Sequence, residues 1–163
     1  MTTLVRHHGG AIIALTFLVA MALTIVPLPD WARIARPDWV ALVLIYWCMA
    51  LPERVGVGVA WVVGILMDVL TGTLLGEHAL ALTVVAYLTL KLHQRIRLYP
   101  VWQQSITVLV LLALNQLLVL WINGIMGRPT QSWLYWTPSL LGMVLWPLIF
   151  AMLRNLRRRF AVS

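Results

Sequence analysis

The sequence predicts an all-α integral membrane protein whose helices form a transmembrane bundle. Of its 163 residues, 62% are hydrophobic and only 10% are charged, and the mean hydropathy is +0.92. Soluble domains contain about 45–50% apolar and about 25% charged residues. Short polar stretches divide the chain into six apolar segments, so we expect a single multi-pass transmembrane domain over residues 1–163. The segments are 9–26, 39–51, 55–75, 79–90, 101–125 and 133–153.

The first segment follows a weakly basic start, as the apolar part of a signal peptide would. It ends in VPLPDW instead of a small-residue cleavage pattern, and further hydrophobic segments follow it. We therefore expect a retained first helix.

The second segment is short for a membrane span. Pro37 suits a helix start and Pro52 marks its end, which leaves roughly 14 residues, or about 21 Å. A span needs about 20 residues, so this helix either thins the bilayer or does not cross. We favour six spans over five because ALVLIYWCMAL would otherwise have no apolar surroundings.

The third segment carries small residues at every fourth position, interrupted by one acid. Small side chains at this spacing let helix backbones approach closely in lipid. The stripe predicts either an interface for a partner or second copy, or packing within this bundle. Its members are Gly56, Ala60, Gly64, Asp68, Gly72 and Gly76.

Asp68 is an acid within an apolar run, which is costly unless the carboxylate is paired. One alternative is that it faces the bundle and pairs with His78, Arg33 or Arg36. The other is that the helix stops near Asp68 and the carboxylate caps the amides of a turn. Both alternatives stay open at this point.

The last three segments also carry polar groups. The fourth can lengthen if Lys91, Arg95 and Arg97 extend their charged heads to the surface. In the fifth, Asn115 and Gln116 are expected to bond across helices. The arginines of RNLRRRF indicate topology first, although they could also hold anionic lipid or a cytoplasmic partner.

The distribution of Lys and Arg predicts the orientation. With six spans, nine of these residues lie on one side and three on the other, whereas with five spans the division is ten to two. The more basic side is cytoplasmic. Both divisions place the 91–100 loop and the carboxyl terminus in the cytoplasm.

Several classes of site lack support in the sequence. Cys48 is the single cysteine, the four histidines are scattered, and no serine is accompanied by a histidine base. We expect no catalytic, metal or cofactor site. We also find no nucleic-acid module, since the excess of basic residues accounts for membrane orientation.

The chain resembles the rod shape-determining protein MreD family over almost its whole length. The matching stretches are IVPLPD, RPDWVALVLIYW, ALPERVGVG, GILMDVLTGTLLGEHALAL, AYL, VWQQ and VLWPLIFAMLRNLRRRFAV. The glycines and aspartate at 64–76 match the family's Gly-x-x-x-Asp-x-x-x-Gly-x-x-x-Gly pattern. No catalytic residue is carried over from the family.

The resemblance implies a cell inner membrane protein of the peptidoglycan-synthesis machinery that elongates rod-shaped bacteria. It implies binding to MreC, and through MreC a link to MreB and to the elongation glycosyltransferase and transpeptidase. It also implies a bundle resembling the substrate-binding subunit of energy-coupling-factor transporters.

Two functions follow from these observations. The first is a non-enzymatic scaffold that grips MreC, or a second copy of the chain, through helix surfaces. The alternative is a solute-binding or transport subunit of a membrane transporter. Such subunits typically carry Ala-x-x-x-Ala on the first helix, whereas Ala11, Ala14, Ala20 and Ala22 lack that spacing. The scaffold is therefore favoured.

Overall fold

The computed structural model describes residues 10–25, 39–50, 55–72, 75–125 and 137–159, and all regular structure in these ranges is helical. The all-α prediction is confirmed, and each of the six apolar segments corresponds to one described helix, although α5 and α7 extend beyond the expected bounds. Arg33 and Arg36 lie outside the described residues. The helices are α1 (Gly10–Ile25), α3 (Trp39–Ala50), α4 (Val57–Thr71), α5 (Glu77–Leu98), α6 (Val101–Ile125) and α7 (Thr137–Arg159).

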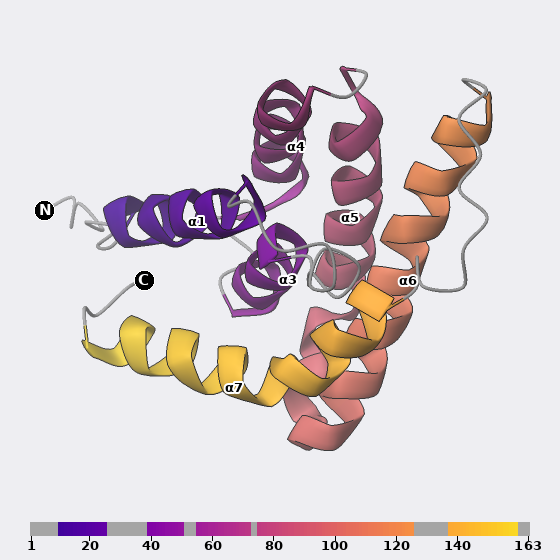
Figure 1. Cartoon of the computed structure of the whole chain (residues 1–163). Coiled ribbons are helices and arrows are strands. Elements are labelled where there is room, and N and C mark those ends of the chain that lie inside the picture. Colours follow the sequence, from indigo (N-terminus) through magenta and orange to yellow (C-terminus); the bar gives the residue numbers. More distant parts are fainter. Residues whose placement is uncertain (1–9, 26–38, 51–54, 73–74, 126–136, 160–163) are drawn as a thin grey trace, which may run out of the picture.

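The short helix α3 lies at the centre of the protein. In Figure 1, α1 lies above it, α7 below it and α5 beside it. Every residue from Val40 to Ala50 is buried. A helix that is hydrophobic on all sides is one that other helices surround. The expectation that ALVLIYWCMAL finds apolar surroundings only if it spans the membrane is therefore wrong. The bundle itself supplies such surroundings whether or not α3 crosses the membrane.

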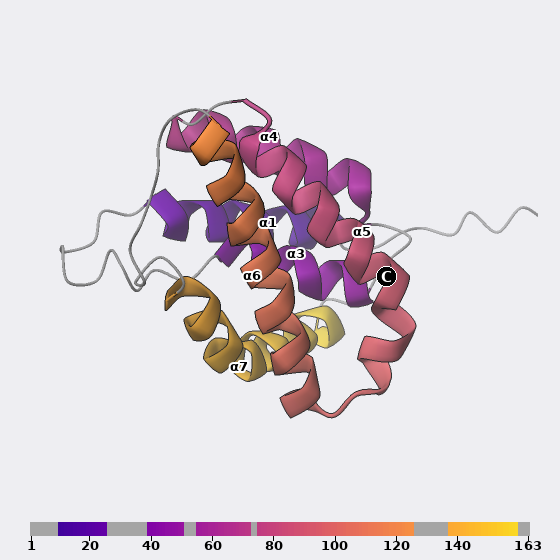
Figure 2. The same cartoon turned by 90° about the vertical axis from the view of Figure 1, so that its right-hand side faces the viewer.

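Helices α4 and α5 form a tightly packed hairpin (Figure 2). The backbone at Gly72, which ends α4, has a φ of +70°, and the backbone at Gly76, which precedes α5, has a φ of +104°. Glycine adopts positive φ at little cost, whereas other residues are strained there. These two glycines therefore allow the chain to reverse between the helices.

The boundary between α5 and α6 differs from the expected one. Helix α5 continues to Leu98, so only Tyr99 and Pro100 join it to α6. The expected 91–100 loop is therefore wrong for residues 91–98. Lysine and arginine favour helices, and their long side chains let charged heads extend away from an apolar stem. The prediction that the fourth helix lengthens through these residues is confirmed.

Two of the described helices contain stretches long and apolar enough to cross a membrane, Val101–Ile122 of α6 and Leu140–Arg159 of α7. Helices α1, α3 and α4 are apolar but shorter. Helix α7 bends along its length in Figure 1 and contains Pro147. Proline removes one helical hydrogen bond and crowds the preceding turn, which accounts for a bend.

Candidate functional site

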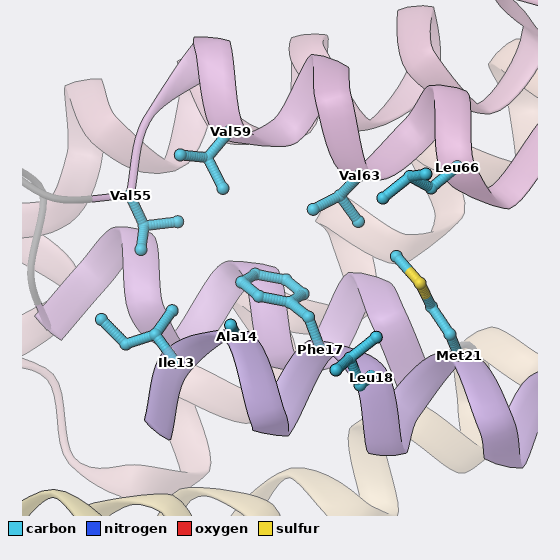
Figure 3. Close-up of a pocket in the computed structure, with 9 residues that line it drawn as sticks. All are labelled: Ile13, Ala14, Phe17, Leu18, Met21, Val55, Val59, Val63 and Leu66. Carbon is cyan, nitrogen blue, oxygen red and sulfur yellow. The ribbon is translucent and has the colours of Figure 1, made fainter. Parts of the chain in front are cut away.

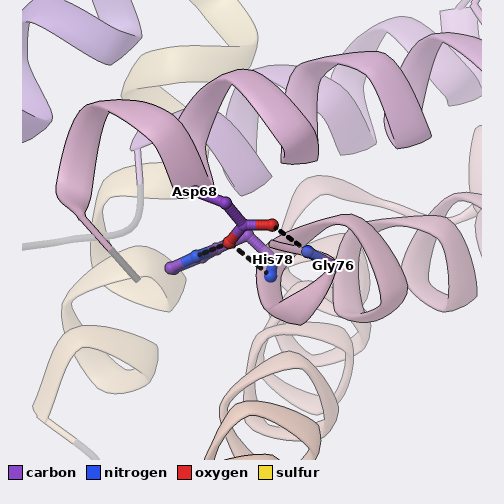
Figure 4. Close-up of polar contacts among 3 residues, drawn as sticks. All are labelled: Asp68, Gly76 and His78. Carbon is purple, nitrogen blue, oxygen red and sulfur yellow. Dashed lines mark hydrogen bonds and ion pairs between the residues drawn. The ribbon is translucent and has the colours of Figure 1, made fainter. Parts of the chain in front are cut away.

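Asp68 lies in the last turn of α4, and its side chain is completely buried. Its Oδ2 atom accepts a hydrogen bond from the Gly76 amide at 2.8 Å, and its Oδ1 atom accepts one from the His78 amide at 2.9 Å (Figure 4). The first amides of a helix have no partner within that helix, and negative charge is favourable there. Asp68 of α4 therefore caps the amino terminus of α5.

The same carboxylate also contacts the His78 side chain. The distance from His78 Nδ1 to Asp68 Oδ1 is 2.7 Å, and His78 is 21% exposed. The structure thus combines two arrangements that the sequence presented as alternatives. The carboxylate caps a turn, and it also pairs with His78, the one of its three candidate partners that the structure describes.

The small-residue stripe lies along the hairpin. Ala60 is fully buried, and a Cβ atom at Gly64 would overlap the Ala79 Cα atom and lie 2.5 Å from the Ala79 nitrogen. A Cβ atom at Gly56 would lie 3.6 Å from Leu90 Cδ1. Together with Asp68 and the two glycines of the turn, these positions join α4 to α5. In the described chain the stripe therefore packs within the bundle.

The amides predicted to bond across helices lie inside the protein. Asn115 and Gln116 of α6 are both buried, with 2% and 9% of their surface exposed. Neither residue lines the cavity between α1 and α4 or the cavity where α3 and α7 end. Their position suits structural contacts between helices more than binding of a solute.

An apolar groove separates α1 from α4, and nothing in the sequence pattern located it. Its volume is about 380 Å³, and all nine residues that line it are hydrophobic. Figure 3 shows side chains of both helices pointing toward each other across this space. A membrane helix is apolar on several faces, so periodicity alone does not separate a groove from a lipid-facing surface. The residues are Ile13, Ala14, Phe17, Leu18 and Met21 of α1, and Val55, Val59, Val63 and Leu66 on the α4 side.

A second cavity, which we call the basic pocket, lies where α3 ends, α6 begins and α7 ends. Its volume is about 300 Å³. The arginines were visible in the sequence, but apart from Phe150 the residues that line the pocket with them come from segments more than 40 positions away. The pocket is lined by Tyr46, Met49, Ala50, Gln104, Phe150, Arg154 and Arg157.

The chemistry of these sites is structural rather than reactive. The Asp68 carboxylate is bonded to backbone amides and to His78, and it lines neither cavity. Within the ranges that the structure describes, no three His, Cys, Asp or Glu side chains are grouped so as to hold a metal ion. The arrangement supports packing and recognition of other molecules.

Comparisons with family models and with individual known proteins agree on one family. A family model described as rod shape-determining protein MreD matches residues 6–156. The rod shape-determining protein MreD of Haemophilus influenzae is 29% identical over 143 residues, which cover 88% of each chain. No solved structure matches. The match extends over nearly all of the sequence, and the chain therefore belongs to the rod shape-determining protein MreD family.

Proposed function

We propose that this protein is a non-enzymatic scaffold of the bacterial cell-elongation machinery, and that the groove between α1 and α4 receives the membrane span of MreC. The family consists of shape-determining membrane proteins rather than enzymes. Through MreC the scaffold would be linked to MreB, the glycosyltransferase and the transpeptidase. Self-association through other helix faces is compatible with this role.

The entirely apolar groove is the observation that carries the proposal. Helices in lipid associate mainly through van der Waals contact, because lipid tails are as apolar as the helix surfaces. A concave surface between Phe17 of α1 and Val59 and Val63 of α4 offers a spanning helix contact on two sides. A flat helix face offers contact on one side only.

The same groove argues against the solute-binding alternative. A pocket for a small metabolite needs several polar groups that converge on the ligand. The groove has none, and the three polar candidates of that region, Asp68, Glu77 and His78, line neither cavity. The likeness of the family to the substrate-binding subunit of energy-coupling-factor transporters stays a prediction.

We further propose a multi-pass arrangement in the cell inner membrane, with six spans and with the carboxyl terminus and the α5–α6 corner in the cytoplasm. Arginine and lysine at one end of the bundle support this orientation. The basic pocket gathers the end of α3, the start of α6 and the end of α7, as that arrangement requires. A topology reporter fused after Arg36 should report the periplasm, whereas a cytoplasmic signal would indicate five spans.

Filling the groove tests the scaffold proposal. The variants Ala14→Trp and Val59→Trp place a large ring in the groove, and Val144→Trp places one on an exposed position of α7. We expect the two groove variants to insert normally but to lose co-purification with MreC, whereas Val144→Trp retains it. Equal co-purification of all three would contradict the groove assignment. Capture of an ATPase with a coupling subunit would favour the transport alternative.

A further inference from the structure

We propose that the basic pocket binds the phosphate headgroup of an anionic phospholipid. The pocket is a cavity of about 300 Å³ whose lining combines two arginines with aromatic and aliphatic side chains. A phospholipid combines both kinds of group, since a charged phosphate is joined to an apolar body. The inference goes beyond the scaffold role and rests on the proposed placement of these helix ends at the membrane surface.

Among the described residues, no acid neutralises the positive charge of the pocket. Arg154 and Arg157 are three residues apart, so they lie on the same face of α7. Among the described residues, neither arginine forms an ion pair with a carboxylate. The two described acids, Asp68 and Glu77, lie at the turn of the α4–α5 hairpin, at the other end of α5.

The negative end of the α3 helix dipole offsets only part of the positive charge of the two arginines. The pocket includes Met49 and Ala50 at the end of α3, where a helix dipole is equivalent to roughly half a negative charge. Two guanidinium groups exceed it by more than one positive charge. A phosphodiester carries a single negative charge and matches the guanidinium fork with paired hydrogen bonds.

The aromatic and aliphatic residues of the pocket suit the apolar part of a lipid. Tyr46 and Phe150 meet edge to face with ring centres 5.7 Å apart, and Met49 lies beside them. Apart from the hydroxyl group of Tyr46, these side chains offer nothing to a free phosphate or to the charged groups of an acidic peptide. The combination therefore favours a lipid over either of those ligands.

Gln104 holds the pocket in shape and is not left to bind the ligand. Its side-chain nitrogen donates to the Ile96 carbonyl at 3.0 Å and to the Tyr99 carbonyl at 3.3 Å, and its oxygen accepts from Trp146 Nε1 at 3.3 Å. These bonds tie the α5–α6 corner to α7. Helix α7, which carries both arginines, is therefore held in place against this corner.

The position of the pocket matches its proposed ligand. In the proposed orientation it opens where helices end at the cytoplasmic leaflet, whose anionic lipids attract basic groups. Basic pockets between helices on this side of a membrane commonly hold anionic headgroups. The arginines would then recognise lipid in addition to setting the orientation of the chain.

The test compares two double variants with equal loss of charge. Arg154→Gln with Arg157→Gln removes both guanidinium groups of the pocket, whereas Arg158→Gln with Arg159→Gln removes two that do not line it. The full chain is placed in nanodiscs of phosphatidylcholine with an increasing fraction of phosphatidylglycerol, and protein-bound lipid is measured by native mass spectrometry. Inorganic phosphate and glycerol phosphate serve as soluble competitors.

We expect the unaltered chain to retain phosphatidylglycerol in preference to phosphatidylcholine. The pocket variant should lose this preference by at least about tenfold, because each charge-assisted hydrogen bond contributes on the order of a tenfold change in affinity. The control variant should keep it, and the soluble phosphates should compete poorly. Circular dichroism and the unfolding temperature check that both variants fold.

Three results would overturn the inference. Equal loss in both double variants would indicate diffuse attraction by the basic tail, and unchanged binding in the pocket variant would exclude the site. Competition by inorganic phosphate as strong as that by lipid would indicate a phosphate site instead. Co-purification with MreC is a separate measurement that the pocket variant should leave unchanged, so failure here is distinguishable from failure of the scaffold proposal.

Discussion

Gly64 of α4 lies directly against the backbone of Ala79 of α5. A Cβ atom at position 64 would lie 2.5 Å from the Ala79 nitrogen and 2.8 Å from the His78 carbonyl carbon. The contact lies one turn of helix from Asp68, whose carboxylate caps the start of α5. Close packing and capping therefore act on the same short region, and both hold the α4–α5 hairpin together.

Replacing Gly64 by alanine should destabilise the protein, because the added methyl group meets backbone that cannot turn away. We expect a loss of about 1–3 kcal/mol in the free energy of unfolding, the cost typical of overpacking. Gly58→Ala is a matched control, since nothing lies within 4 Å of a Cβ atom at that position. Alanine there should be neutral or stabilising by roughly 0.5–1 kcal/mol.

Unfolding temperatures of the two purified variants in mild detergent measure the difference. A Gly64→Ala variant as stable as the unaltered chain would show that α4 and α5 do not approach this closely. If Gly64→Ala and Gly58→Ala lowered the temperature equally, the effect would come from glycine itself and not from the contact with Ala79.

Substitutions at Asp68 should follow a graded order. Asp68→Asn keeps one oxygen acceptor but turns an NH₂ group toward one of the two amides, leaving it unsatisfied at about 1–3 kcal/mol. Asp68→Leu removes both acceptors and should cost more. His78→Ala keeps the His78 amide bond and removes only the ring contact, so we expect the smallest loss.

Thermal unfolding and the rescue of rod shape in cells measure this order. A ranking in which His78→Ala is as harmful as Asp68→Leu would show that the contact between side chains matters more than the cap. Equal effects of Asp68→Asn and Asp68→Leu would indicate that the negative charge itself is needed.

The turn offers a third test through its backbone. Gly72 has a φ of +70° and a ψ of +22°, close to the left-handed helical region. Asparagine is tolerated there better than residues with a branched Cβ atom. We expect Gly72→Asn to lower the unfolding temperature less than Gly72→Val does, and a reversed order would contradict strain as the cause. Nothing lies within 4 Å of a Cβ atom at this position, so steric contact does not explain a difference.

The sequence predicted the helices well because the bilayer imposes long apolar segments between polar stretches. It also identified Asp68 and the small-residue stripe, since a buried acid and closely spaced glycines are unusual in such a segment. It left open whether the stripe faces another chain, because spacing along one helix does not reveal the neighbour. The contact between Gly64 and Ala79 required knowledge of how α4 and α5 are arranged in space.

The central position of α3 and the two cavities could not be predicted for the same reason, because they depend on how the helices are arranged in space. ALVLIYWCMAL is apolar on every side, and this pattern suits a lipid-facing helix as well as a central one. Arg154 lines the same cavity as Tyr46 and Gln104 only because three helix ends converge. Local sequence patterns do not record contacts between segments that lie far apart along the chain.

The contact between α1 and α3 supplies the last prediction. Trp47 is fully buried, and its Nε1 atom donates to Thr16 Oγ1 at 2.9 Å. Thr16→Val keeps the size of the side chain but leaves this indole donor without its acceptor, at a cost of about 1–3 kcal/mol in the free energy of unfolding. Thr16→Ser keeps the hydroxyl group and loses only a methyl group, so it should be the milder change. Unfolding temperatures in detergent compare the two. If serine proved as harmful as valine, packing of the threonine methyl group would be the cause, and the hydrogen bond would contribute little to holding the central helix in place.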